Sequence, residues 1–152
     1  MILDENNITV LVIDDDEINR QIAEMVLKKN FSYRVLTADS GMSGYELMQH
    51  HTVHLVLLDV SMPGWDGMKT LQFIRSNEKL KNTPVIMLTA AADRETVVKA
   101  SSYGVKDYLR KPFLPDELTA RVAKAIWDNW LQQDFDSLES DLDALLKSVE
   151  IK

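Results

Sequence analysis

The sequence predicts an α/β fold built on a parallel sheet, because short apolar runs alternate with segments of helical periodicity along its 152 residues. A chain of this length is typical of one domain with its own core. We expect five strands, at residues 8–13, 33–38, 53–58, 84–89 and 105–109. The first, third and fourth are continuously apolar, which is typical of central strands that helices cover on both faces.

The segments between the strands predict five helices, at residues 17–29, 41–50, 66–76, 94–103 and 115–131. In the first helix, helical spacing places four apolar residues on one stripe, which we expect to face the core: Ile18, Ile22, Met25 and Val26. We interpret Asp16 as a loop starter or N-cap, and Asp66 as the cap of the third helix. Gly104 is placed to end the fourth helix.

Composition excludes several classes of protein. The formal net charge of −7, from 24 acids and 17 bases, provides no positive field to attract nucleic acid or an anionic membrane. The chain has no cysteine, which excludes disulfides, thiolate metal sites and a cysteine nucleophile. It has no apolar run near the roughly 20 residues that span a bilayer, and no signal-peptide pattern. We therefore expect a cytoplasmic protein that contacts neither membrane nor nucleic acid directly.

The strand and helix pattern is (βα)5 over residues 8–131. With right-handed crossovers, the common solution is a flavodoxin-like, doubly wound sheet of strand order 2-1-3-4-5. In such sheets ligands bind outside the carboxyl ends of the strands. At those ends the sequence places four polar segments: Asp14-Asp15-Asp16, Asp59, Thr89 and Arg110-Lys111-Pro112.

The acids after the first and third strands should converge, because these strands are neighbours in the predicted order. Carboxylates that close repel one another unless a cation lies among them. Oxygen ligands of this kind suit Mg²⁺. Three histidines lie before or at the start of the third strand, at the opposite end of the sheet, and we interpret them as part of a solvated helix end and not as a metal site: His50, His51 and His54.

The strand-end residues together predict phosphoryl chemistry. A carboxylate such as Asp59 acts as a nucleophile toward phosphorus in aspartyl-phosphate formation. A metal, a lysine and a hydroxyl then neutralise the phosphoryl oxygens, and Lys111 and Thr89 provide the last two. Each residue alone has an ordinary structural explanation. All four strand ends nevertheless supply groups that fit a single phosphoryl site, which favours the joint interpretation.

Four motifs in order carry a specific resemblance: residues 10–16 (VLVIDDD), 57–67 (LLDVSMPGWDG), 87–90 (MLTA) and 107–113 (DYLRKPF). Over about residues 8–131 the chain resembles the receiver domain of two-component response regulators, including chemotaxis regulators. The resemblance implies that Asp59 accepts a phosphoryl group from a phosphohistidine on a sensor histidine kinase or a histidine phosphotransfer protein.

The resemblance also implies roles for the neighbouring residues. Asp15 would bind Mg²⁺ directly, Asp14 largely through water, and the backbone carbonyl of Ser61 would be a further ligand beside Asp59. Lys111 would contact the phosphoryl oxygens, and Thr89 would donate its hydroxyl to one of them.

The resemblance further implies a conformational switch. Thr89 would move toward the phosphoryl group, and Tyr108 would turn into the space behind it. The surface of helix four, strand five and helix five would then change and control a partner or an output domain. The Lys111-Pro112 bond resembles the cis peptide of the family.

Two alternative functions are disfavoured. A phosphohydrolase of the haloacid dehalogenase type would carry an aspartate where Ser61 stands, two residues after the nucleophile. A flavin or nucleotide binder would need a phosphate-binding loop where Asp14-Asp15-Asp16 would repel the phosphate. We expect no enzymatic activity beyond phosphoryl transfer to Asp59 and autodephosphorylation, whose rate the family tunes at Ser61 and Ala91. Trp65 is interpreted as loop packing.

The domain organisation is predicted as an N-terminal tail at 1–7, the receiver domain at 8–131 and an acidic amphipathic helical tail or truncated linker at 132–152. Apolar residues of the tail region follow a heptad-like spacing: Leu131, Phe135, Leu138, Leu142, Leu145 and Val149. Two interpretations stay open, a helix packed on its own domain or truncated linker, and a dimerisation helix. If the chain forms a homodimer, we expect the contact through this tail or through the surface of helix four, strand five and helix five.

Overall fold

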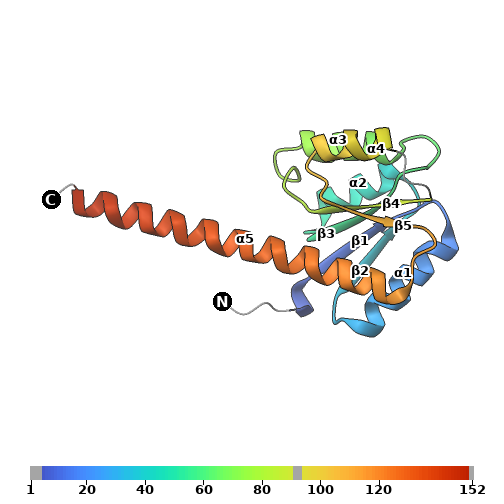
Figure 1. The fold of residues 1–152 in the computed structure, drawn as a ribbon, viewed down its shortest axis with the longest axis horizontal. Helices are drawn as coiled ribbons and strands as arrows, with labels where there is room; N and C mark the ends of the chain where they lie inside the picture. Colours follow the sequence, from blue (N-terminus) through green and yellow to red (C-terminus); the bar gives the residue numbers. More distant parts are fainter. Residues whose placement is uncertain (1–4, 91–93, 151–152) are drawn as a thin grey trace.

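A five-stranded parallel sheet in the order β2-β1-β3-β4-β5 forms the centre of the molecule (Figure 1). The computed structural model describes residues 5–90 and 94–150. The strands are β1 (Thr9–Ile13), β2 (Arg34–Ala38), β3 (Leu55–Asp59), β4 (Val85–Thr89) and β5 (Asp107–Arg110). The flavodoxin-like order predicted from the sequence is confirmed, and the three continuously apolar strands are the central ones.

Helices cover both faces of the sheet (Figure 1). A short 3₁₀ helix, η1 (Glu5–Asn7), precedes β1. One face carries α1 (Glu17–Asn30) and the first part of α5 (Pro115–Glu150). The other face carries α2 (Gly41–His50), α3 (Gly67–Ser76) and α4 (Arg94–Ser102). In the described part of the chain, no helix is long and apolar enough to cross a membrane.

Successive residues of the central strands alternate between two apolar cores. Val10 and Val12 of β1 point to the core under α1 and α5, and Leu11 and Ile13 point to the core under the other helices. All four side chains have no exposed surface. Continuous apolar runs are therefore required in these strands, because each face of the sheet needs its own set of buried side chains.

The predicted helix signals are confirmed. Asp16 caps α1, accepting a hydrogen bond from the backbone N of Asn19 at 3.1 Å, and Asp66 caps α3 in the same way. Gly104 follows α4 with a φ of +80°, a backbone conformation that favours glycine. These caps fix where α1 and α3 begin, and both helices begin next to the carboxyl edge of the sheet.

The predicted buried face of α1 is wrong for three of its four residues. Ile18, Ile22 and Met25 are exposed, at 66%, 38% and 63%, and only Val26 of the stripe is buried. The residues of α1 that pack in the core form a second apolar set instead, which consists of Ala23, Val26 and Leu27. Both sets have helical spacing, and packing on β1 and β2 decides between them.

The helical tail predicted after residue 131 is confirmed, but it is a continuation of α5, so the predicted end of that helix at residue 131 is wrong. The helix continues to Glu150 as one rod that projects away from the domain (Figure 1). The sequence has no glycine or proline after Pro115 to stop it. The apolar residues of the projecting part are exposed, so this segment does not pack on its own domain. Three sequence predictions fall partly or wholly outside the described residues. They concern residues 1–4 of the N-terminal tail, Ala91, and residues 151–152 of the C-terminal tail.

Candidate functional site at the carboxyl edge of the sheet

The register of the central strands brings two aspartates together. Ile13 of β1 is paired with Leu58 of β3, so the next residues, Asp14 and Asp59, are neighbours across the carboxyl edge. Both are buried, Asp14 completely and Asp59 with 5% of its surface exposed. Asp15 is exposed beside them. The convergence of acids predicted from the strand order is present.

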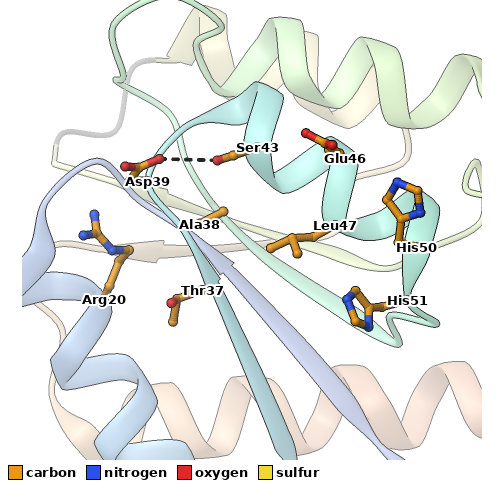
Figure 2. Close-up of a pocket in the computed structure, with 9 residues that line it drawn as sticks. All are labelled: Arg20, Thr37, Ala38, Asp39, Ser43, Glu46, Leu47, His50 and His51. Carbon is orange, nitrogen blue, oxygen red and sulfur yellow. Dashed lines mark hydrogen bonds between the residues drawn. The ribbon is translucent and has the colours of Figure 1, made fainter.

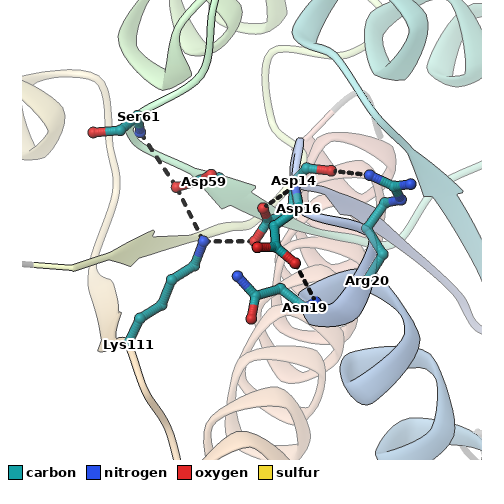
Figure 3. A network of polar contacts seen from close by, with 7 residues as sticks. All are labelled: Asp14, Asp16, Asn19, Arg20, Asp59, Ser61 and Lys111. Atoms are coloured by element: carbon teal, nitrogen blue, oxygen red, sulfur yellow. Dashed lines mark hydrogen bonds and ion pairs between the residues drawn. The ribbon is translucent and has the colours of Figure 1, made fainter.

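Lys111 lies between the two buried carboxylates (Figure 3). Its Nζ is 2.6 Å from Oδ2 of Asp14 and 3.3 Å from Oδ1 of Asp59. It reaches this position because β5 pairs with β4, and the backbone N of Lys111 donates to the carbonyl of Thr89 at 2.7 Å. The Lys111-Pro112 peptide bond is cis, as the resemblance implies.

Backbone donors hold the two carboxylates in place. The N–H of Asp16 donates to Oδ1 of Asp14 at 2.9 Å, and the N–H of Ser61 donates to Oδ1 of Asp59 at 3.2 Å. Each is a turn in which an aspartate accepts from the residue two positions later. The side chains are therefore positioned by their own loops and by Lys111.

Burial raises the pKa of Asp59 to about 6, and the nearby carboxylate of Asp14 adds to the rise. The Lys111 ammonium and the N–H of Ser61 act in the opposite direction, since both stabilise the ionised carboxylate. The site therefore holds an acidic group whose charge is costly near neutral pH and would be stabilised by a further cation.

The donor set at this edge fits a hard divalent cation. Asp14, Asp15 and Asp59 each offer a carboxylate oxygen, and these atoms lie within 4.8 Å of one another. Within residues 5–90 and 94–150, no other group of three or more acids or histidines is close enough to share an ion. Carboxylate oxygens are the ligands that Mg²⁺ prefers.

The histidines lie away from the acidic cluster. His50 and His51 line a hollow between α1, β2 and α2, whose other end holds Asp39 and Arg20 (Figure 2). His54 is partly buried, and its Nδ1 accepts a hydrogen bond from the backbone N of Thr9 at 3.0 Å. His54 thus contacts the start of β1 and is not simply part of a solvated helix end, as the sequence suggested.

Two positions that contribute to the site had no role in the sequence analysis. A Cβ on Gly67 would lie 2.4 Å from the carbonyl oxygen of Asp59, so only glycine lets α3 begin this close to the end of β3. The guanidinium of Arg20 donates to the carbonyl of Asp14 at 2.8 Å and joins α1 to the site (Figure 3). A glycine at the first position of a predicted helix could have pointed to the role of Gly67. The sequence around Arg20 contains no signal that predicts its contact with Asp14.

The two predicted switch residues lie on neighbouring strands. Thr89 ends β4, next to the strand that carries Asp59. Tyr108 of β5 donates its hydroxyl to the carbonyl of Val97 at 2.9 Å and is 3.0 Å from Oγ of Ser101, both on α4. Tyr108 therefore ties β5 to the outer helix α4.

The loop after β3 is packed by aromatic side chains. Trp65 stacks on Phe73 of α3, with ring centroids 4.1 Å apart, and also contacts Tyr45 of α2. Loop packing, the interpretation of Trp65 from the sequence, is what the structure shows. Ser61 is exposed in the same loop.

The stretch of chain that carries this site matches a known protein family. Residues 10–123 match the family model of the response regulator receiver domain. The chain is 33% identical over 118 residues to chemotaxis protein CheY-3 of Vibrio cholerae, a match that covers 78% of this chain and 91% of that protein. The solved structure of Vibrio cholerae chemotaxis protein CheY4 superposes with a TM-score of 0.74 at 28% identity, covering 78% of this chain and 98% of the other.

A much longer relative matches nearly the whole chain. Hybrid signal transduction histidine kinase D of Dictyostelium discoideum is 36% identical over 149 residues. That match covers 95% of this chain and 9% of the kinase. This chain therefore resembles one small segment of that protein.

Proposed function

Because this chain belongs to the response regulator receiver domain family, we propose that it accepts a phosphoryl group on Asp59 and switches a protein-binding surface in response. Response regulators receive phosphoryl groups from histidine kinases or phosphotransfer proteins, and phosphorylation of an aspartate is general in this family. The observation that carries the assignment to Asp59 is its place in a buried Asp14–Lys111–Asp59 arrangement at the carboxyl edge.

The geometry supports Asp59 as the nucleophile. Lys111 and the N–H of Ser61 both contact its Oδ1, and we assign the attack to Oδ2. Oδ2 forms a bond to phosphorus while the phosphorus–nitrogen bond of the donor phosphohistidine breaks and releases the imidazole. In autodephosphorylation, water attacks phosphorus and releases inorganic phosphate from Asp59. Beyond these two steps we propose no enzymatic activity.

The family generally binds Mg²⁺ at its acidic pocket, and here Asp14, Asp15, Asp59 and the carbonyl of Ser61 would hold it. When bound, Mg²⁺ would neutralise negative charge on the carboxylates and on the phosphoryl oxygens. Lys111 and the hydroxyl of Thr89 would contact the remaining phosphoryl oxygens. Ser61 is a short hydroxyl that does not supply an acid or amide to direct water, so we expect a phosphorylated lifetime that is not extremely short.

The switch would act on the contact between Tyr108 and α4. The phosphoryl group on Asp59 would carry a charge of about −1.5 to −2, which attracts the Thr89 hydroxyl. Tyr108 would then turn inward and give up its hydrogen bond to Val97. Since α4, β5 and α5 form one surface, this change would alter how that surface binds a partner, a second copy or an output domain.

We expect a protein partner and not nucleic acid, because the chain as a whole has a net charge of −7 and provides no overall positive field. The cytoplasmic location and the domain limits stay predictions.

Incubation with acetyl phosphate and Mg²⁺ tests the proposal. Intact-mass spectrometry should show one added phosphoryl group on the wild-type chain and none on Asp59→Asn. Equal labelling of both proteins would contradict the assignment. Asp39→Asn is the matched control and should label as the wild type does, because Asp39 lies outside the acidic cluster.

A further inference from the structure

The projecting part of α5 carries an exposed apolar seam. Its six residues, spaced by four and three positions in turn, are between 43% and 65% exposed: Leu131, Phe135, Leu138, Leu142, Leu145 and Val149. This spacing places them on one stripe of the helix, the a and d positions of a heptad pattern. An exposed apolar stripe of this length marks a surface for another protein segment.

The positions that flank the seam carry acids and no base. With the seam at a and d, the charged residues at the e and g positions from 131 to 149 are Asp134, Glu139 and Asp141. Lys147, the only base in this segment, is at an f position on the opposite side of the helix. Flanking charges of this kind select the partner of a helix, because they lie opposite the flanking residues of the second helix.

A second copy of this chain does not suit these charges. In a parallel pair, Asp134 of each helix would face Glu139 of the other, since g lies opposite the following e. In an antiparallel pair that overlaps the whole seam, Glu139 would face Glu139 and Asp141 would face Asp141. Either orientation sets like charges against each other beside the apolar contact, which destabilises the pair.

We propose that this seam binds an amphipathic helix of another protein whose apolar stripe is flanked by lysine or arginine. Its bases would lie opposite Asp134, Glu139 and Asp141, while its apolar residues cover the seam. The same acids that oppose self-association then favour this partner. The inference rests on α5 alone and does not depend on the phosphoryl site.

Two synthetic helical peptides test the proposal against the unphosphorylated chain of 152 residues. Both carry leucine at every a and d position; one has lysine and the other glutamate at every e and g position. Fluorescence anisotropy should show the lysine peptide binding at least about tenfold more tightly than the glutamate peptide. The triple variant Asp134→Lys, Glu139→Lys, Asp141→Lys should reverse this order.

Controls separate the seam from the net charge of the protein. Leu138→Asp leaves the flanking acids in place but interrupts the apolar stripe, so it should abolish binding of the lysine peptide. Its side chain is 61% exposed, so the substitution should not unfold the domain. Sedimentation should show the unphosphorylated wild-type chain as a monomer at micromolar concentration. A wild-type dimer through the seam, equal binding of both peptides, binding of neither, or full binding by Leu138→Asp would each overturn the proposal.

Discussion

The ammonium of Lys111 is 2.6 Å from Oδ2 of Asp14, closer than to Asp59, at 3.3 Å. The Asp14 side chain is completely buried and that of Lys111 is 16% exposed, so the pair is shielded from water. Lys111 therefore supplies the positive charge that the converging carboxylates require. A divalent cation at the same carboxylates has to compete with it.

Lys111→Ala should bind Mg²⁺ more tightly and accept phosphoryl groups more slowly. Removal of the competing ammonium should strengthen binding by about three- to tenfold, the equivalent of about 1 kcal/mol for one ion pair. Titration calorimetry measures the affinity, and acetyl phosphate labelling measures the rate. Lys111→Arg keeps the charge and is the matched control. Weaker Mg²⁺ binding by Lys111→Ala would show that Lys111 organises the carboxylates instead of competing for them.

Asp59→Asn should stabilise the fold above pH 6 in the absence of Mg²⁺. The pKa of Asp59 is raised from 3.8 to about 6, so between these values the folded chain binds a proton that the unfolded chain has lost. The wild-type free energy of unfolding therefore falls as pH rises through this window and then stays lower. Asparagine has no such titration. At about 1.4 kcal/mol for each pKa unit, the gain at pH 7 is at most about 3 kcal/mol.

Urea unfolding of both proteins across the pH range measures this difference. It should shrink toward pH 4, where Asp59 is protonated in the folded chain. A constant difference from pH 4 to pH 8 would contradict the proposed cause. Saturating Mg²⁺ should also reduce the difference, because binding stabilises the wild type by about 2.7 kcal/mol at 100 times the dissociation constant.

His54 should make the fold less stable in acid. Burial lowers the pKa of His54 below 6.5, and Nδ1 accepts a hydrogen bond only while it is unprotonated. As pH falls below 6.5, the unfolded chain takes up a proton first, so stability is lost from there downward. In His54→Asn the side-chain amide can still accept the hydrogen bond from Thr9 but does not titrate, so this variant should not lose stability as pH falls below 6.5. His50→Asn, at an exposed position of α2, should keep it; the same pH dependence for all three proteins would rule out His54 as the source.

Ile18→Asp should slow phosphoryl transfer from a protein donor but not from acetyl phosphate. Ile18 is 66% exposed on the first turn of α1, next to the loop that holds Asp14, and with Ile22 and Met25 it forms an apolar surface beside the site. A protein that delivers a phosphohistidine to Asp59 would cover this surface. Transfer from phosphorylated histidine phosphotransfer domains should fall by about tenfold or more, the effect of a contact worth above 1 kcal/mol. Leu142→Asp, on the distant part of α5, is the control, and equal slowing with both donors would place the effect on Asp59 itself.

The sheet and the convergence of its acids were predictable from the sequence because both depend on local patterns. Continuous apolar runs identify β1, β3 and β4 as central, and the strand order then places Asp14 beside Asp59. The N-caps Asp16 and Asp66 were predictable for the same reason, since a cap acts on the helix that follows it.

Features that depend on tertiary contacts were not predictable in this way. In α1 the stripe of Ile18, Ile22 and Met25 and the set around Leu27 both have helical period, and only packing on the sheet chooses between them. The length of α5 was underestimated because its buried face ends near Ile126 while its helical propensity continues. Lys111 lies closer to Asp14 than to Asp59, at 2.6 Å against 3.3 Å, and a motif does not encode this difference in side-chain distances.

Mapping of the phosphoryl group tests the central claim most directly. After incubation with acetyl phosphate and Mg²⁺, borohydride reduces an aspartyl phosphate to homoserine, and peptide mass spectrometry locates the reduced residue. The structure predicts homoserine at position 59 alone, because Asp59 is the buried carboxylate that Lys111 and the N–H of Ser61 hold at the edge of the sheet. Homoserine at position 14 or 15, or a phosphoryl group retained on a histidine, would contradict the account.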